Sequence, residues 1–89
     1  MMKAVVTVVG QDKTGIVAGI ANELAAYGVN ILDLSQTIMS KTFTMSMLVE
    51  LGGEDSFNEL HAALKEKGTK MGVAVHVQRE EIFEAMSRI

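Results

Sequence analysis

A polar loop near the N-terminus holds the residues whose types and spacing are most suited to binding chemistry. It reads GQDKTG over residues 10–15 and joins an apolar run to an apolar-periodic segment. Two glycines spaced in this way form half of a phosphate-binding loop, but Ile16 and Val17 stand where that loop needs Lys and then Ser or Thr. The dinucleotide-binding pattern fails too, because Asp12 would place a carboxylate where the pyrophosphate must approach. The loop is therefore not expected to hold a phosphate.

The same loop is suited to a zwitterion if a helix begins directly after it. Backbone N–H groups and the positive end of the helix dipole favour a carboxylate. Asp12 could accept a hydrogen bond from an ammonium group, so an α-amino acid fits this pairing. The residues alone leave an alternative open. Asp12 would then only cap the helix by accepting from the N–H of Thr14 or Gly15, which is worth about 1 kcal/mol, and Gly10 would only make the turn.

The elements that flank this loop follow from the apolar periodicity. A β-branched run over Met2–Val9 predicts a first strand that is apolar on both faces. Apolar positions at helical spacing predict a helix that begins at Lys13 or Thr14 and ends at Gly28. Gly15 would then lie in the first helical turn. A glycine there costs up to about 1 kcal/mol relative to Ala and is tolerated best where a backbone or ligand comes close.

Two further strands and a second helix are predicted downstream. The segment Val29–Ser40 alternates imperfectly, which indicates a strand with a bulge or an edge position. Strict alternation from Phe43 to Leu51 predicts the next strand. A helix is expected over Glu54–Gly68, with Asp55 or Ser56 as its N-cap and Gly68 as its stop.

Individual residues in these strands carry their own predictions. Asp33 is expected to be an edge charge that discourages aggregation rather than a pocket residue. The methionines Met39, Met45 and Met47 are expected to pack in the core and on the sheet face.

The chain closes with a strand over Gly72–Gln78 and a short amphipathic helix over Arg79–Ile89. The order predicts a single α+β domain over residues 1–89, with its core in residues 2–78. We expect the ferredoxin-like βαββαβ sandwich, a four-stranded antiparallel sheet with two helices on one face and the first and third strands at its centre. The opposite face stays open although the first strand is apolar there too, so a second copy is expected to cover it.

Composition excludes several classes of function. Cysteine is absent, which removes disulfides, thiolate metal ligands and a cysteine nucleophile and favours the cytoplasm. A net charge of -3 without a long basic block disfavours nucleic acid, and no apolar run is long enough to span a membrane. No cofactor, metal ion or catalytic centre is expected, since His61 and His76 are far apart in the sequence and no serine has a plausible base nearby.

Residues Met2 to Gln78 resemble an ACT domain, the small regulatory module that senses amino acids in metabolic enzymes and regulators. The resemblance is carried by Asp12-x-x-Gly15-Ile16, which opens the first helix, and by Gly28-x-Asn30-Ile31, which opens the second strand. More narrowly, the chain is similar to stand-alone single-domain bacterial ACT proteins and to the N-terminal part of glycine cleavage system regulators.

The resemblance implies a homodimer or higher homo-oligomer with a ligand site between the first loop of one copy and the second strand of its neighbour. Its residues would be Gly10, Gln11, Asp12, Gly15 and Ile16 on the loop side, with Asn30 and Ile31 opposite.

Two functions are therefore predicted as alternatives. The first is a non-catalytic, cytoplasmic regulatory module that binds an amino acid or similar small molecule and acts on a regulatory protein partner of unknown identity. The second is a protein–protein interaction module that uses the open sheet face or the C-terminal helix and binds no small molecule.

Overall fold

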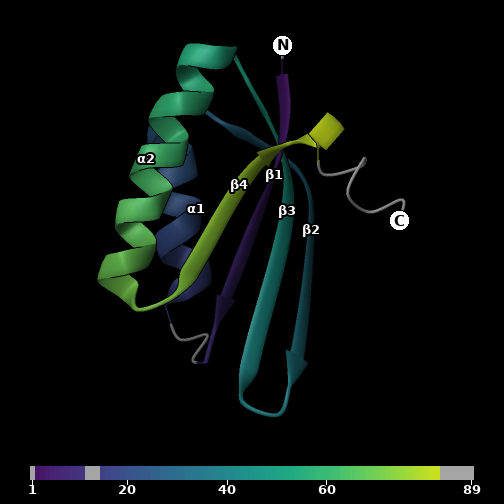
Figure 1. Ribbon diagram of the computed structural model, residues 1–89, viewed down its shortest axis with the longest axis vertical. Coiled ribbons are helices and arrows are strands. Elements are labelled where there is room, and N and C mark those ends of the chain that lie inside the picture. The colour runs from purple at the N-terminus through teal and green to yellow at the C-terminus, as the bar shows by residue number, and fades with distance from the viewer. Residues whose placement is uncertain (1, 12–14, 83–89) are drawn as a thin grey trace.

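Four strands and two helices make up the part of the chain that the computed structural model describes, residues 2–11 and 15–82. In chain order they are β1 (Met2–Gly10), α1 (Ile16–Ala26), β2 (Asn30–Met39), β3 (Thr42–Leu51), α2 (Glu54–Met71) and β4 (Ala74–Arg79). The strands form one antiparallel sheet in the order β2-β3-β1-β4. Both helices lie on the same face of this sheet (Figure 1). The predicted ferredoxin-like fold is confirmed, with β1 and β3 at its centre.

The chain turns into a helix directly after β4. Residues 80–82 are helical. The predicted helix was expected to start at Arg79, which is instead the last residue of β4. Residues 83–89 of that prediction lie outside the described residues.

The hydrophobic core lies between the sheet and the helices and is built from alternate residues of the two central strands. Val6 lies opposite Met47, and Val8 lies opposite Met45. Because directly opposite residues share one face of a sheet, these pairs form rows that α1 and α2 cover. The buried members of β1 and β3 on this face are Ala4, Val6, Val8, Phe43, Met45, Met47, Val49 and Leu51. The alternation predicted for the third strand is thus confirmed.

The methionine prediction holds for two of its three residues. Met45 and Met47 are buried in the core, whereas Met39 is 72% exposed at the end of β2. Its predicted core position was wrong because β2 is an edge strand whose ten residues are all exposed.

Helix α1 ends at a glycine, as predicted. Gly28 has φ 67°, and its N–H donates to the carbonyl of Ala25 at 3.1 Å. The next N–H, of Val29, donates to the carbonyl of Leu24 at 3.0 Å. These two bonds make up the Schellman motif, which satisfies the last carbonyls of a helix and reverses the chain. The turn leads directly into β2.

The prediction of Asp55 or Ser56 as the N-cap of helix α2 was wrong, because the helix begins two or three residues earlier than either cap would allow. Its N-cap is Gly53, so Asp55 and Ser56 lie in or next to the first turn and do not cap it. The carboxylates of Glu54 and Asp55 still favour this end of the helix, because they face the positive end of the helix dipole.

The same helix continues past Gly68 and ends at Met71, with Gly72 in the left-handed region at φ 72°. The prediction that Gly68 stops the helix was wrong, because the absence of a side chain there serves packing against β4. A Cβ at Gly68 would lie 2.6 Å from Val75 Cγ2 and 3.1 Å from the carbonyl oxygen of Val73.

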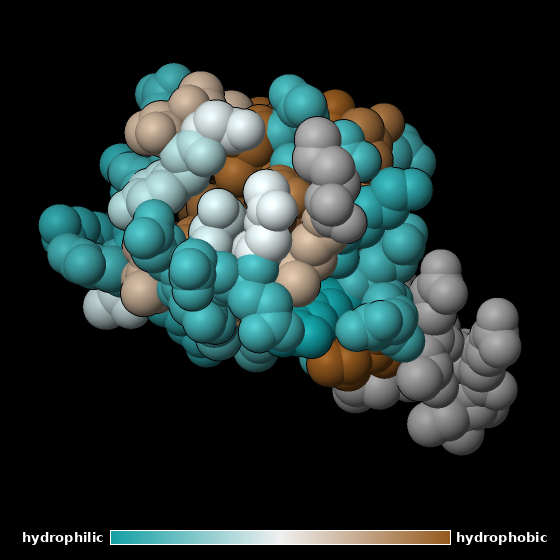
Figure 2. Space-filling view, turned by 90° about the horizontal axis from the view of Figure 1, so that it is seen from above, coloured by the Kyte–Doolittle hydropathy of each residue, from teal (hydrophilic) through white to brown (hydrophobic). Residues whose placement is uncertain are grey.

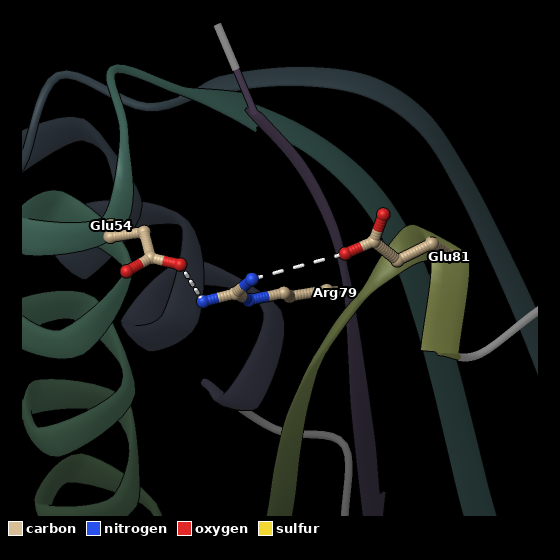
Figure 3. Close-up of polar contacts among 3 residues, drawn as sticks. All are labelled: Glu54, Arg79 and Glu81. Carbon is tan, nitrogen blue, oxygen red and sulfur yellow. Dashed lines mark hydrogen bonds and ion pairs between the residues drawn. The ribbon is translucent and has the colours of Figure 1, made fainter.

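Arg79 joins the end of β4 to the start of α2 (Figure 3). Its guanidinium group donates to the carboxylate of Glu54, and its Nη1 lies 3.9 Å from Oε1 of Glu81. Its Cζ lies 5.8 Å from the ring centroid of Phe57, and that ring lies 6.0 Å from the ring of His61. His61 therefore takes part in packing at this end of α2, which accounts for its half-buried position.

Replacement of two helical glycines by alanine should have different effects on the stability of the protein. Gly68→Ala should lower the free energy of unfolding by about 1–2 kcal/mol, because a crowded core position resists added volume. At Gly19, a Cβ would meet the flexible ends of two side chains, at 2.9 Å from Cε and 3.0 Å from Sδ of Met71 and at 3.5 Å from Cε of Lys67. Gly19→Ala should therefore leave stability unchanged or raise it by up to about 1 kcal/mol through helix propensity. Urea unfolding followed by circular dichroism measures both, and equal effects of the two substitutions would contradict this packing role.

Candidate functional site

The loop between β1 and α1 lies at the end of the sheet where the β2–β3 hairpin turns (Figure 1). Gly10, the last residue of β1, lies opposite Phe43, and Phe43 lies opposite Ile38 of β2. The loop is thus level with the second half of β2. Asp12 and the two residues that follow it lie outside the described residues. Whether Asp12 caps the helix or meets a ligand stays a prediction.

Gly10 and Ile16 form the buried floor of this loop. A Cβ at Gly10 would lie 2.6 Å from Val73 Cγ1 and 3.4 Å from Ile16 Cδ1. The side chain of Ile16 is itself in the core, with 3% exposure. Neither residue offers a side chain to solvent, so both could reach a ligand only through backbone atoms.

Gln11 and Gly15 form the exposed part of the described loop. Gly15 precedes α1 as its N-cap at φ 76°, so its predicted place inside the first helical turn was wrong. A left-handed residue turns the chain into the helix here, and this conformation favours glycine. Among the described residues, no atom would lie within 4 Å of a Cβ at Gly15.

The start of α1 leaves backbone donors without helical partners. The first bond of the helix runs from the N–H of Gly19 to the carbonyl of Gly15 at 2.8 Å. The N–H groups of residues 16–18 come before it and therefore have no acceptor within the helix. The first turn contains no acidic residue. These donors and the positive end of the helix dipole make the start of α1 favourable for an anion.

Asn30 and Ile31 lie at the other end of β2, away from the loop. Asn30 lies opposite Glu50, which lies opposite Lys3 near the start of β1. Nine residue steps separate the two ends of β2, which is about 30 Å at the usual rise of a strand. A single chain therefore does not bring Asn30 or Ile31 to the loop.

Strand β2 presents an uncovered apolar edge. The register shifts between Ile31 and Asp33, which is the predicted bulge, and the strand is an edge of the sheet. Leu34 and Ile38 lie opposite the buried residues Met47 and Phe43, so they continue the core face beyond the two central strands. The large hydrophobic side chains that β2 exposes are Ile31, Leu32, Leu34, Ile38 and Met39. Figure 2, which looks down on the end of the sheet where β1 begins, shows hydrophobic surface between hydrophilic side chains.

The face of the sheet opposite the helices is more polar than predicted. A row of polar residues crosses all four strands, because Thr7 lies opposite both His76 and Ser46, and Ser46 lies opposite Ser35. On this face β1 presents the apolar side chains of Val5, which is 9% exposed, and Val9, which is 36% exposed.

Asp33 lies on this open face, where its Oδ1 accepts from the N–H of Leu34 at 2.8 Å. With Val5, Ser35, Ser46 and neighbouring β3 residues, it lines a shallow hollow of about 190 Å³. Asp33 is thus an exposed charge on an edge strand, as predicted, and it also borders a hollow, which the sequence did not indicate.

Two kinds of feature are absent from the described part of the chain. Over residues 2–11 and 15–82, no group of His, Asp or Glu is arranged to hold a metal ion. Neither α1 nor α2 combines the length and the hydropathy needed to cross a bilayer.

The fold and the loop define a ferredoxin-like βαββαβ module with an exposed glycine directly before its first helix. Within this class the chain belongs to the ACT domain family, since the family model described as "ACT domain" matches residues 3–78. ACT domains are generally regulatory modules that bind small molecules.

Similar proteins agree with this membership. A UPF0237 protein of Clostridium acetobutylicum is 49% identical over 89 residues, which are 99% of this chain and 100% of that protein. The solved "ACT domain protein from Streptococcus pneumoniae" is 41% identical with a TM-score of 0.82, covering 93% of this chain and 94% of that one. A putative glycine cleavage system transcriptional repressor is 26% identical with a TM-score of 0.79, over 88% of this chain and 45% of that one.

The left-handed conformation of Gly15 predicts a specific cost for alanine. Gly15→Ala should lower the free energy of unfolding by about 1 kcal/mol although its Cβ meets no described atom, because the cost is conformational. Gly15→Asn should cost less, since asparagine tolerates this region. As a control, Gly52→Ala places a Cβ 3.5 Å from Ser56 Oγ, an ordinary contact, and should change stability little. Urea unfolding of the three variants measures this. An asparagine variant less stable than the alanine variant would contradict it.

Proposed function

We propose that this chain is a non-catalytic, cytoplasmic regulatory module that binds an amino acid or a similar small zwitterion at the β1–α1 loop, and that a second copy completes the site. The observation that carries this proposal is the start of α1, where the exposed Gly15 adjoins backbone donors without helical acceptors. Membership of a family of regulatory modules supports the same reading.

The carboxylate and the ammonium group of the ligand would bind different parts of this loop. The carboxylate binds the first N–H groups of α1, because the helix dipole favours negative charge there. Asp12 and the amide of Gln11 accept hydrogen bonds from the ammonium group. Gly10 and Ile16 form the packed floor. The side chain of the ligand then points away from the floor, toward the second copy.

Strand β2 is the surface through which the second copy would bind. If the β2 strands of two chains pair antiparallel, the sheet becomes continuous and the unpaired backbone groups of both edges are satisfied. A two-fold axis through the middle of β2 brings the Asn30 end of one strand beside the Met39 end of the other. The Met39 end is level with the loop. This arrangement supplies Asn30 and Ile31 to the loop of the neighbour, which one chain cannot do.

The exposed part of α1 is compatible with such pairing. Its exposed residues include Ala18, Asn22, Ala25 and Ala26, and Glu23 is the one ionisable residue between Ile16 and Ala26. Small, uncharged side chains allow a second helix to approach closely without burying a charge. The free-energy cost of covering the exposed side of α1 with a second copy is therefore low.

Ligand binding should raise the melting temperature of the wild-type protein. At about a hundred times Kd, a ligand stabilises by about 2.7 kcal/mol, which for a domain of this size is a shift of about 10 °C or more. We expect at least one of the twenty amino acids to give such a shift in a thermal screen. Asp12→Asn should abolish it, whereas the matched change Asp55→Asn, at an exposed position in the first turn of α2 and outside both the loop and β2, should preserve it. If no amino acid shifts the transition, the protein–protein interaction alternative is supported instead.

Pairing through β2 should depend on its central residue. Leu34 lies near the middle of β2, so Leu34→Glu would place two carboxylates beside the two-fold axis. Burying like charges together is costly, and sedimentation equilibrium at micromolar concentration should find this variant monomeric and the wild type dimeric or larger. Ile82→Glu, at an exposed hydrophobic residue outside β2, is the control and should keep the wild-type assembly. A Leu34→Glu variant that stays dimeric would rule out this interface.

A further inference from the structure

A groove of about 430 Å³ runs between the outer sides of α1 and α2, apart from both the loop and β2. It is lined by Glu23 and Tyr27 of α1 and by Glu59, Ala62, Ala63, Glu66, Lys67 and Lys70 of α2. The α2 residues recur at intervals of three, one, three, one and three, so they form a single stripe along the helix. The neighbouring stripe, Leu60, Leu64 and Gly68, is buried in the core.

The walls of this groove are held in place by packing. Lys67 is half-buried, and its Cε lies 3.5 Å from the position of a Cβ at Gly19. Its aliphatic stem therefore lies over α1, next to Gly19. Between the charged residues, Ala62 and Ala63 leave a floor without long side chains, on which a narrow ligand could lie.

Charge is unevenly distributed along the groove. Lys70 pairs with Glu66 at 3.2 Å, so this pair is neutral overall. Among the ion pairs found in the described residues, none includes Glu23, Glu59 or Lys67. Glu59 precedes Lys67 by eight residues of α2, which is about 12 Å along the helix axis. Tyr27, at the end of α1, adds a hydroxyl group to the acidic side. The groove thus has an acidic stretch and a cationic end.

We propose that this groove binds an extended peptide of three or four small residues. Its N-terminal ammonium group binds the carboxylates of Glu59 and Glu23, and its C-terminal carboxylate binds Lys67. At about 3.3–3.6 Å per extended residue, such a peptide spans the 12 Å or so between these charges. A single amino acid is too short to reach both ends, and a polyamine would meet Lys67 without a negative charge. The site is independent of the proposed loop ligand, because no residue that lines the groove belongs to the loop or to β2.

The probe for this site is tetra-alanine, with its N-acetylated and C-amidated forms as ligand controls. In a ¹⁵N–¹H titration, tetra-alanine should shift the amide signals of residues 59–70 and 23–27. Because the groove is open to solvent, the peptide can enter it directly, and we expect a Kd of about 1 mM or below. Each blocked peptide should bind at least about tenfold more weakly, since each loses one charge. Shifts confined to residues 10–16, or equal binding of all three peptides, would overturn the proposal.

A pair of lysine variants tests the cationic end. Lys67→Gln should weaken tetra-alanine binding by about tenfold, a difference of about 1.4 kcal/mol, and should abolish the advantage over the C-amidated peptide. Lys65→Gln removes the same charge from an exposed position of α2 outside the groove and should bind like the wild type. Equal losses in the two variants would show that only net charge matters and would overturn the site. Thermal shifts with free amino acids test the loop separately, so failure of one site leaves the other intact.

Discussion

The pairing of β3 with β1 on one side and with β2 on the other determines where the β1–α1 loop and the open edge of this molecule lie. The β1–β3 register places Gly10 opposite Phe43, so the loop and the β2–β3 turn share one end of the sheet. The β2–β3 register places Asn30 opposite Glu50, at the other end. The same pairing leaves β2 as an edge whose residues are all exposed. A small domain with an apolar open edge buries too little surface alone. In the proposed assembly, a second copy would cover this edge and supply the distant half of the ligand site.

The sequence predicted the fold where local signals and tertiary packing agree. The alternation from Phe43 to Leu51 corresponds to a half-buried central strand, and Gly28 both ends α1 and adopts the left-handed conformation that a helix end favours. The bulge and edge position of β2 followed from its irregular pattern, because an edge strand is not required to alternate strictly.

Prediction from the sequence failed where the role of a residue is set by a contact with a distant part of the chain. Gly68 resembles a helix stop, but its role is set by Val75 of β4, which no local pattern reveals. Gly15 was predicted to lie in the first turn of α1, because a glycine before a helix and a glycine within its first turn look alike in sequence. In the candidate site, only the structure reveals that Gly15 is exposed and that Ile16 is buried. The groove between α1 and α2 was missed because its two stripes are recognisable only when the helices are placed side by side.

Mixing two binding-deficient variants tests most directly whether the site is shared between two chains. Asp12→Ala removes the loop carboxylate, and Asn30→Ala removes the group expected from the neighbour. Each variant alone should bind the amino acid weakly by titration calorimetry. After the two are mixed and allowed to exchange subunits, each heterodimer contains one intact site, so tight binding should return at about a quarter of the wild-type stoichiometry for random pairing. A mixture that binds no better than its components would contradict a site formed between copies.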